Sequence, residues 1–485
     1  MFKLLWQNED GMVLPLVVVM IAVFTILGFS ALFMVDTQAG LEEKEIHRTG
    51  ALHYAEAGIN DYLGHLNRRI NVPWDKWNVP VPFEDGYYQL EQVEFDESSL
   101  TRVIQATGWV AGDEGNKRTI RAKIGRRAFN EYAYFSHDDG PNIYWKTGEV
   151  CYGPYHTNNI LNISGTPTFY GPVTYSKDVI GVGNNAKKIF RAGYRMVPEI
   201  KLPNNNYQLK ERALERGHYY FGRTRILLDG DRYHVKYYEE ITDGRGRKTY
   251  QEQEKRNLPL PENGVIYVDG GNDGKFAATS GNLFIAGELS GNLTVGAAND
   301  IYILGYDPLE NQWEKNVKQG NKTVTKKPDP VPNAATQGIV YKNTVFRQVK
   351  SGKEVTGYEA DGDDMLGLVA NNKIRILGED WFDGVKADVA PNNITIHAAL
   401  FSINEGFGYE SYTKYKKENI ILRGSLVQHT RKPVGETDWM GKKTGYYKDY
   451  AHDPRMLTTA PPNFPEPLNT GWEIKEWIVD PPEDR

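Results

Sequence analysis

The hydrophobic pattern of the chain opens with a long run that carries no charge. Residues 12–35 read MVLPLVVVMIAVFTILGFSALFMV, in which only Pro15, Thr25, Gly28 and Ser30 depart from apolar types. As a helix this run would rise about 36 Å, enough to cross a hydrocarbon core of about 30 Å. A cleaved secretory signal has a shorter apolar core and small residues at its cleavage site, whereas polar and charged residues follow here. We therefore expect a membrane anchor.

A second helical pattern continues directly from the first. Apolar residues recur at steps of three and four, which is typical of an amphipathic helix: Leu52, Ala55, Ile59, Tyr62, Leu63, Leu66 and Ile70. Read as one element, residues 12–70 predict a helix roughly 90 Å long. Its front half is apolar all round, and its rear half is apolar on one face. The front would pack in lipid or in the core of a fibre, and the rear would carry a globular head.

Short alternating stretches follow the helix. YYQLEQVEF, RVIQATGWVA and KRTIRAKIG have the period of two that is typical of half-buried strands, and GDEGN predicts a turn between the last two. We expect residues 71–130 to form a small antiparallel sheet packed on the rear of the helix.

The body, residues 131–470, follows a different pattern. An Asn stands just before a short β-rich run, and a small residue usually follows the run: such runs come after Asn159, Asn282, Asn292, Asn299, Asn372, Asn393 and Asn419. Asn and Gly tolerate the left-handed backbone conformation that tight corners need. Short strands joined by such corners favour a right-handed parallel β-helix, here called a β-solenoid. The expected fold class is therefore mainly β. An antiparallel sandwich is the alternative, because hairpins also use Asn and Gly.

Two stretches interrupt the body. Residues 184–262 include a predicted helix, YQLKERALERG, and a predicted hairpin, RTRILLDGDRYHVKYYEE, with its turn at Asp-Gly. Residues 306–363 are rich in Lys, Asn and Pro and predict a long exposed loop with strands. The proline-rich segment 461–467 and the WEIKEW sequence after it are expected to cover an open end of the solenoid, with residues 471–485 as a carboxy-terminal tail.

Composition narrows the choice of function. Glycine (48), tyrosine (30) and proline (25) suit a turn-rich β protein, and the mean hydropathy of −0.56 describes a soluble body behind the anchor. A net charge of −6 argues against general nucleic-acid binding. The single cysteine, Cys151, excludes an internal disulfide and a cysteine-based zinc site, and we expect it to be packed rather than reactive.

The amino terminus resembles that of type IV pilins, and especially of PilX-like minor pilins. The resemblance rests on NEDG followed by MVLPLVVVMIAVFTILGFSALFMV, and on ALHYAEAGINDYL in the amphipathic stretch. It implies a leader, residues 1–11, that a prepilin peptidase removes between Gly11 and Met12. It also implies residence in membrane lipid before assembly, with other pilins and the pilus assembly machinery as partners.

Two features depart from the pilin pattern. The fifth mature position, counted from Met12, is Leu16, where most major pilins have a glutamate. The leader MFKLLWQNEDG has one lysine against two acidic residues, although prepilin leaders are usually basic. An uncleaved signal anchor therefore stays open as an alternative.

The body carries resemblances of its own. CYGPYHTNNILNISGTPTFYGPVT is similar to a stretch of bacterial pilus-assembly proteins with PilX-type amino termini. Later segments, up to about residue 470, look like an uncharacterised domain that follows such starts. More distantly, the chain is similar to competence-associated minor pilins in which a solenoid is inserted into the pilin head. These resemblances imply architecture and context more than an activity.

Enzymatic and metal chemistry find little support in the motifs. The chain has no G-x-x-x-x-G-K-[ST] loop, no H-E-x-x-H and no G-x-S-x-G. His156 has polar neighbours, but we expect it to bond the backbone at a corner. Two acidic loops could bind calcium or could be solvated turns: Asp269 with Asp273, and Asp361 with Asp363 and Asp364. We predict no catalytic residue, no metal and no cofactor.

One local charge excess remains. Residues 187–256 hold 17 Lys or Arg against 10 Asp or Glu, interleaved with tyrosines. Basic groups neutralise phosphates or acidic sugars, and aromatic faces stack on bases or sugar rings. The candidate ligand-binding residues are Arg223, Arg225, Arg232, Tyr233, Arg245, Arg247 and Lys248. The alternative is an exposed charged hairpin whose tyrosines simply pack.

These observations predict a single-pass membrane protein with its body outside the cytoplasm, at the cell surface or on a pilus. We expect a minor-pilin-like structural subunit whose solenoid head serves adhesion or pilus assembly. Two other functions stay open: a DNA-receptor pilin for natural transformation, and a surface polysaccharide-active β-helix enzyme.

Overall fold

The computed structural model forms two compact units, and each is described by itself. It describes residues 13–68, 73–96, 101–126, 128–140, 143–309, 317–319, 322–324, 338–382, 385–437, 443–468 and 471–479. The first unit comprises Met1–Phe95, Arg102–Ile124 and Trp472–Arg485, and the second comprises Asp96–Thr101 and Gly125–Gly471. The predicted leader and its cleavage bond, Gly11–Met12, lie outside the described residues.

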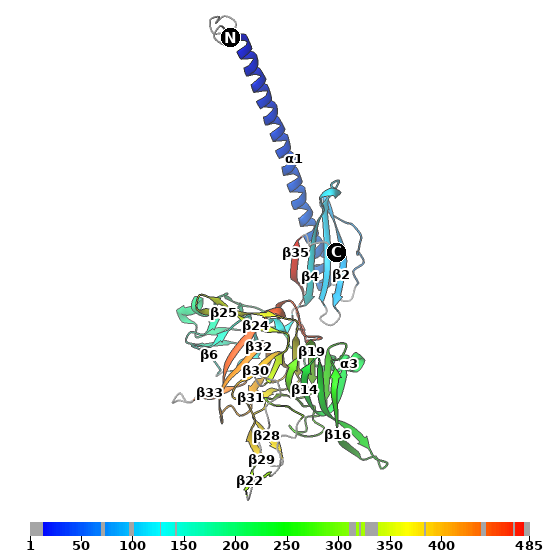
Figure 1. The fold of residues 1–485 in the computed structure, drawn as a ribbon, viewed down its shortest axis with the longest axis vertical. Coiled ribbons are helices and arrows are strands. Elements are labelled where there is room, and N and C mark those ends of the chain that lie inside the picture. The colour runs from blue at the N-terminus through cyan, green and yellow to red at the C-terminus, as the bar shows by residue number, and fades with distance from the viewer. Residues whose placement is uncertain are drawn as a thin grey trace, which may run out of the picture. The chain divides into compact units, whose positions relative to one another are not determined.

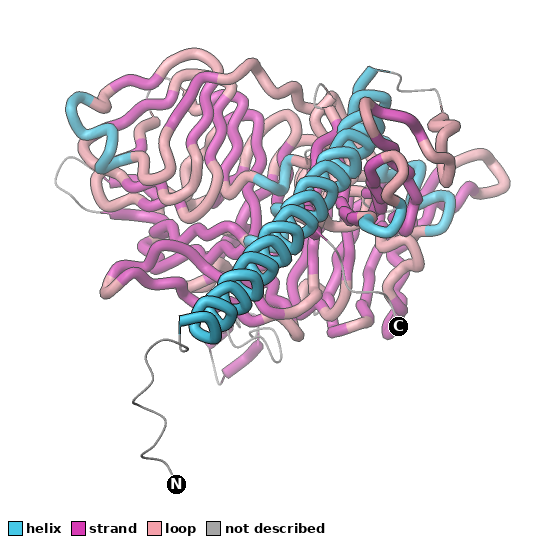
Figure 2. Tube along the Cα trace, turned by 90° about the horizontal axis from the view of Figure 1, so that it is seen from above, coloured by secondary structure: helices cyan, strands magenta, loops and turns pink. Residues whose placement is uncertain are grey.

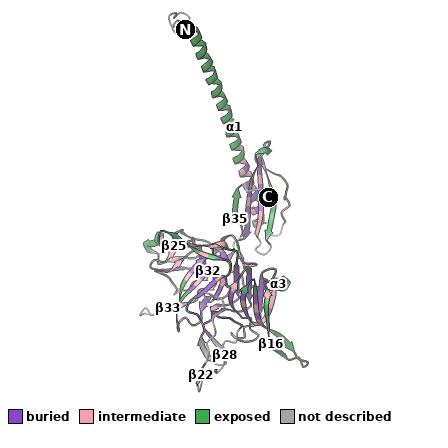
Figure 3. Ribbon diagram, viewed as in Figure 1, coloured by how far each residue is buried: buried purple, intermediate pink, exposed green. Residues whose placement is uncertain are grey.

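The first unit is built on one long helix. Helix α1 runs from Val13 to Arg68 without interruption, as the joined hydrophobic patterns predict (Figures 1 and 2). Its front half is exposed, whereas four side chains of its rear half are fully buried (Figure 3): Ala51, Ala55, Ile59 and Tyr62. Their spacing of three and four residues places them on one face of the helix.

A five-stranded sheet receives this face, in the order β1-β2-β3-β4-β35. The strands are β1 (Val81–Phe83), β2 (Gly86–Asp96), β3 (Thr101–Val110), β4 (Arg118–Arg126) and β35 (Trp472–Val479). β1 with β2, and β3 with β4, pair in the predicted antiparallel sense. Every second residue of these strands joins the core, and a Cβ on Gly108 would lie 2.1 Å from the backbone oxygen of Ala51. Glycine at this position therefore lets the helix approach the sheet closely.

The carboxy-terminal segment differs from the prediction. WEIKEW forms most of β35, an edge strand of the first unit's sheet next to β4, instead of covering an open end of the body. Asn67, near the end of α1, donates to the Trp472 carbonyl at 3.0 Å and accepts from the Trp472 N–H at 2.7 Å. The preceding proline-rich segment packs Phe464 against Phe401 in the body, with ring centroids 6.1 Å apart.

The second unit is dominated by short strands. They are β5 (Tyr134–Asp138), β6 (Trp145–Lys146), β7 (Val150–Cys151), β8 (Tyr155–Thr157), β9 (Leu161–Ser164), β10 (Thr168–Phe169), β11 (Val173–Tyr175), β12 (Val179–Ile180), β13 (Tyr194–Met196), β14 (His218–Gly230), β15 (Arg232–Thr242), β16 (Lys248–Pro259), β17 (Val265–Asp269), β18 (Leu283–Leu289), β19 (Asn292–Ala297), β20 (Ile301–Ile303), β21 (Val317–Gln319), β22 (Lys322–Val324), β23 (Gly338–Tyr341), β24 (Val345–Ser351), β25 (Glu354–Asp361), β26 (Met365–Ala370), β27 (Ile374–Ile376), β28 (Glu379–Phe382), β29 (Val385–Asp388), β30 (Ile394–Ser402), β31 (Phe407–Tyr409), β32 (Lys416–Thr430), β33 (Gly435–Thr437) and β34 (Lys443–His452).

Most of these strands belong to one sheet that closes on itself. A long parallel series runs β14-β17-β19-β26-β30-β32-β5-β8-β11-β13. Residues of the main core lie in register along this series: Ile266, Val295, Leu368, Leu400, Leu426, Tyr134, Tyr155 and Val173. The prediction of a mainly β chain with parallel strands behind a long helix is confirmed, and the right-handed solenoid stays a prediction.

The opposite face of the same series is also covered. Leu209 and Ala213 of helix α3 (Tyr207–Arg216) join a second core with Tyr267 and Phe401 on the strands. Strands buried on both faces read as continuous apolar runs, which explains sequences such as MLGLVA in β26.

The predicted corners form by a different mechanism. None of the Asn residues expected at corners has a positive φ. Instead, Asn372 donates to Asn299 at 2.5 Å and Asn299 to Asn282 at 2.7 Å, so equivalent amides bond from one strand layer to the next. The expectation for glycine holds at the exit of β9, where Gly165 has a φ of 81°.

Both predicted insertions contain strands of the closed sheet. In 184–262, the predicted helix is α3, and the predicted hairpin is the antiparallel pair β14–β15. β14 also pairs in parallel with β17 and β18, so it is part of the body. In 306–363, β23 pairs in parallel with β18 and β30, and β24–β25 form an antiparallel hairpin. The side chains of residues 310–337 lie outside the described ones.

Candidate functional site

The first candidate site is the front half of α1, here defined as residues 14–35. Leu14 is 75% exposed, Phe24 64% and Phe33 77%, and no part of the most apolar 18-residue window, of mean hydropathy 2.7, is buried. By length and composition α1 could cross a membrane, and within the described residues it is the one helix that could. Among the described residues of the first unit, none covers the apolar surface of this half of the helix.

The backbone and one polar side chain of this front half are bonded within the helix. Thr25 donates its hydroxyl to the Ile21 carbonyl at 2.7 Å, and the backbone groups are bonded along the helix. Pro15 lies in the first turn, where its missing N–H leaves no intrahelical bond unmade. The backbone of the front half can therefore enter an apolar environment with its hydrogen bonds made.

Small residues interrupt the apolar surface of α1. A Cβ added at Gly28 or at Gly40 would meet nothing within 4 Å. Leu16 is 62% exposed. Gaps at small residues let neighbouring helices approach closely, which is how apolar helices pack in lipid.

The second candidate, the basic segment, is not gathered into one surface. Arg223 is only 14% exposed in its side chain and donates to the Phe276 carbonyl at 2.5 Å. Arg225 is 8% exposed, and Tyr233 is fully buried with its hydroxyl 2.7 Å from that of Tyr220. These three predicted ligand residues serve the packing of β14 and β15.

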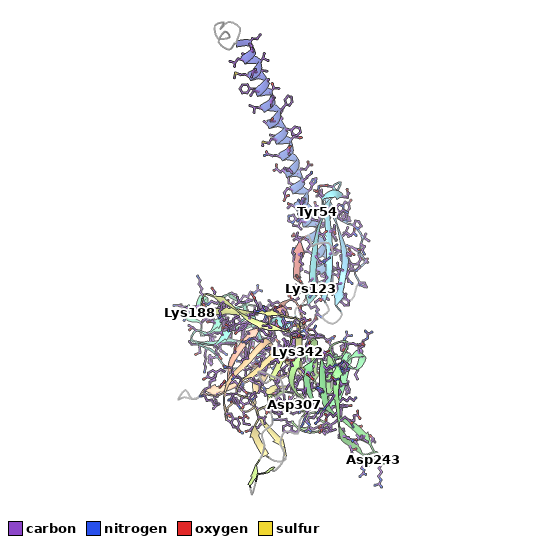
Figure 4. All side chains as sticks on the ribbon, in the orientation of Figure 1. Tyr54, Lys123, Lys188, Asp243, Asp307 and Lys342 are labelled. Atoms are coloured by element: carbon purple, nitrogen blue, oxygen red, sulfur yellow. The ribbon has the colours of Figure 1, made fainter. Side chains whose placement is uncertain are left out.

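The other four predicted residues lie along the β15–β16 hairpin. Asp243, labelled at the hairpin's end in Figure 4, accepts from the backbone N–H groups of Arg245 and Arg247 at 2.8 and 2.9 Å. The Arg247 Nε lies 2.8 Å from Asp243, and Lys248 Nζ lies 2.9 Å from Glu240. Arg232 donates to a backbone carbonyl at 3.1 Å. Carboxylates of the same hairpin thus pair with much of the local positive charge.

The acidic loops have structural partners. Asp269 lies 2.6 Å from Lys210 Nζ and accepts the Tyr219 hydroxyl at 2.6 Å, and the Lys210 contact contributes to holding its pKa low. Asp273 accepts the Thr279 hydroxyl at 2.5 Å. In the other loop, Asp364 is fully buried and accepts the Gly291 N–H at 2.8 Å, and Asp361 pairs with Arg347 at 3.2 Å.

The two residues singled out for possible chemistry are packed inside the body. Cys151 is 3% exposed, and burial raises the pKa of its thiol to about 12. His156 is fully buried, with its ring nitrogens 2.8 Å from the Thr174 hydroxyl and 2.7 Å from the Asn158 side-chain oxygen. Both ring nitrogens thus lie within hydrogen-bond distance of side chains, whereas the sequence predicts a bond to the backbone. Within the described ranges, no three His, Cys, Asp or Glu side chains gather into a possible metal site.

Sequence reasoning missed a polar cluster inside the body. It centres on Arg431, which is 5% exposed, and includes Asp139, Tyr155 and Trp145. Arg431 follows β32 in the sequence HTRKP, which has the appearance of an ordinary charged loop. No periodicity marks it as interior, so the sequence carried no signal for this cluster.

Comparisons with known proteins give limited matches. A family model described as a domain of unknown function (DUF4900) matches residues 90–177, from within β2 to just beyond β11. No curated protein matches the sequence. The crystal structure of the competence-associated pilin ComZ from Thermus thermophilus is similar at 10% sequence identity, over 90% of this chain and 98% of that chain, with a TM-score of 0.22.

Proposed function

We propose that the chain is a pilin-like structural subunit. In this proposal, α1 anchors it in the membrane and then packs against the helices of other pilins, while the β body is displayed at the cell surface for adhesion or pilus assembly. The observation that carries the proposal is the division of one unbroken helix into an exposed apolar front half and a rear half embedded in a sheet.

The front half gains free energy by leaving water. Burying one large apolar side chain contributes about 1.5–3 kcal/mol. The exposed apolar side chains between Leu14 and Val35 therefore represent a driving force on the order of tens of kcal/mol for entering lipid or a helix bundle. A helix suits both environments because its backbone groups are bonded within it.

The rear half supports assembly rather than anchoring alone. The sheet holds the rear of α1 through Ile59 and Tyr62, and the Tyr88 hydroxyl donates to Asp61 at 2.6 Å. Because the head is fixed to the helix that packs against neighbouring subunits, the packing of that helix sets the position of the head along the fibre. Gly28 and Gly40 provide positions where neighbouring helices could approach.

For the body, we propose a right-handed solenoid with a display role and no catalysis. Its support is the parallel series with interior residues in register, since connections between parallel strands are overwhelmingly right-handed. The DNA-receptor alternative rested on the local charge excess, and three of its seven candidate residues are engaged inside the fold: Arg223, Arg225 and Tyr233. The polysaccharide-active alternative relied on acidic loops whose carboxylates have partners here.

The test separates anchoring from assembly in cells that make the full chain. Leu27→Arg places one charge on the front half, where Leu27 is 58% exposed. One central arginine costs about 2.5–3.5 kcal/mol of insertion energy, which the remaining apolar run offsets, so the variant should stay in the membrane fraction. It should disappear from the sheared surface-fibre fraction, because a charge between packed helices is not tolerated.

Glu56→Gln, on the half-buried rear part, is the matched control and should appear in fibres like the unmodified chain. Mass spectrometry of the fibre fraction should find an amino terminus at Met12. An unprocessed chain confined to the membrane would support the uncleaved anchor instead, and a chain found in the cytosol would overturn the proposal.

A further inference from the structure

The interior polar cluster lies where the strand stacking of the second unit is broken. β6, β9 and β12 form a separate three-stranded sheet, and β6 is its edge strand. Trp145 of β6 stands at that edge, with the Arg431 guanidinium carbon 5.0 Å and the Lys448 ammonium 5.8 Å from its ring centroid. Two cations therefore converge on one edge of a sheet inside the body. We call this group, with Tyr134, Asp139, Glu149, Tyr155 and Tyr450, the Arg431 cluster.

Among the residues that the structure describes, three polar atoms of the cluster have no hydrogen-bond partner. They are Arg431 Nη1, Trp145 Nε1 and the Tyr450 hydroxyl, and all three atoms are buried. The side chains are deep in the core: Trp145 is 2% exposed, Arg431 5% and Tyr450 9%. A buried donor without a partner costs about 1–3 kcal/mol, and more if it is charged. Two N–H groups and one hydroxyl of the cluster therefore have a donor that is not used.

The carboxylates of the cluster are already engaged. Asp139 accepts from the Ser136 hydroxyl at 2.6 Å and from the Tyr155 hydroxyl at 2.7 Å. Arg431 Nη1 lies 4.0 Å from Asp139, which is beyond hydrogen-bond reach. Glu149 lies 2.8 Å from Lys448 Nζ and accepts the Lys146 N–H at 2.9 Å. Neither carboxylate satisfies the free donors.

Positive charge is in excess around these donors. Among the described residues, the charges that act on Arg431 and Lys448 include the carboxylates of Asp139 and Glu149, and the ammonium of Lys443 also acts on Lys448. Burial, and then the nearby charge of Arg431, lower the pKa of Lys448 to about 8, although Glu149 is in contact with it. The Lys448 side chain is 27% exposed and Glu149 28%, so these two residues connect the cluster to solvent.

We propose that the Arg431 cluster binds a small oxyanion, held by Arg431 and Lys448 with the Tyr450 hydroxyl as a further donor. An oxyanion supplies the acceptors that three unpartnered donors lack, and its charge balances the excess cation. Arg is well suited to this role because its guanidinium donates in a fixed planar geometry to carboxylates, sulfates and phosphates. The anion is either free and inorganic or the carboxylate of an acidic sugar.

The experiment uses the purified full chain in detergent and inorganic sulfate as the first probe. Titration calorimetry should detect one site, and the unfolding temperature should rise with sulfate when ionic strength is held constant with chloride. Tyr450→Phe should weaken sulfate binding about tenfold, as expected for loss of one hydrogen bond to a charged group. Lys448→Met should weaken it at least as much.

Tyr409→Phe is the matched control, because Tyr409 is also a buried tyrosine and is not a member of the Arg431 cluster. It should leave sulfate affinity unchanged. Tyr450→Phe should unfold, without sulfate, at the same or a higher temperature than the unmodified chain, which verifies that it is folded. An equal sulfate response in all variants would be a general salt effect on burial and would overturn the proposal, as would the absence of calorimetric binding by every probe.

Parallel titrations identify the source of the anion. Phosphate is compared with acetate and with galacturonate at matched ionic strength. Tighter binding of galacturonate than of acetate would point to the carboxylate of an acidic sugar, with the cluster as a subsite of the displayed body. Binding confined to sulfate and phosphate would identify a free inorganic anion. Both patterns must be weakened by Tyr450→Phe for the assignment to stand.

Discussion

In the first unit, five strands bury one face against the rear of α1, whereas in the second unit the stacked parallel strands are buried on both faces. The first core depends on one stripe of a helix and on a close approach at Gly108. The second is a stack in which each strand continues the core of the strand before it, as in Ile226, Ile285 and Ile303. The same chain therefore uses an alternating apolar pattern for the sheet that is covered on one face and continuous apolar runs for the stack.

The sharpest test of the helix-on-sheet contact is Gly108→Val. Its Cβ would lie 2.1 Å from the Ala51 carbonyl oxygen and 2.5 Å from the Ala55 nitrogen, and backbone atoms cannot move aside as a flexible side chain can. We expect a loss of about 4 kcal/mol in the free energy of unfolding of this unit. Hydrogen exchange of β2–β4 amides should accelerate accordingly.

Gly64→Ala provides the control for that substitution, because a Cβ there would meet nothing within 4 Å. Alanine in a helix is favoured over glycine by up to about 1 kcal/mol, so exchange in β2–β4 should stay the same or slow down. If the β2–β4 amides of Gly108→Val exchanged as slowly as those of the unmodified chain, this result would contradict the close packing of α1 on β3.

In the stacked core the corresponding test is Ile285→Ala. Ile285 is fully buried, and Ile226 and Ile303 lie in register with it on the two neighbouring strands. Removing three carbons should cost about 3 kcal/mol, through lost burial and the cavity that remains. Val345→Ala, at a position that is 55% exposed, should change stability by less than about 0.5 kcal/mol. Amide exchange in β14, β18 and β20 measures the stability of both variants. An equal loss of stability in Ile285→Ala and Val345→Ala would show that the stack is loosely packed.

A third test uses pH to probe a histidine buried in the second unit. Burial first, and then the charges of Arg423 and Arg455, lower the pKa of His397 to about 3, and its Nδ1 accepts the Tyr341 N–H at 3.0 Å. The unfolded chain takes up a proton near pH 6.5, whereas the folded chain does not. Stability is therefore lost as pH falls below about 6.5, by about 2 kcal/mol between pH 7.5 and 5.

His397→Asn keeps an acceptor for Tyr341 and should remove this part of the pH dependence in urea unfolding. His53→Asn removes an exposed histidine, 68% exposed in its side chain, and should leave the pH dependence of the body as it was. If His397→Asn loses as much stability on acidification as the unmodified chain, another group is responsible.

The smallest effect is expected on the β15–β16 hairpin, which extends the second unit beyond its core. Lys248→Gln removes an ion pair with Glu240 that is open to water, since the lysine side chain is 61% exposed. Water and salt screen such pairs, so urea unfolding should not change measurably at low or at high salt. A clear loss at low salt would mean that the hairpin contributes to the fold as a charged unit.

Several elements were predictable because the residues of each one favour, by themselves, the structure that they adopt in the fold. The unbroken helix follows from an apolar run joined to an amphipathic one, and the β14–β15 hairpin follows from its Asp-Gly turn. Other features depend on partners far away in the sequence. The engagement of Arg223 requires Phe276, and the membership of WEIKEW in the first sheet requires Asn67, 405 residues before Trp472.

The sequence by itself therefore determined the helix, the strand-rich body and the apolar surface of the front half, because hydrophobicity and turn propensity act over a few residues. Tertiary structure alone decided which charges are buried, which strand closes the first sheet, and where Asn side chains bond from layer to layer. The physical reason is that a charged or amide side chain has the same local preferences inside and outside a fold. Only the neighbours brought to it by folding determine whether it is solvated, paired or left with an unused donor.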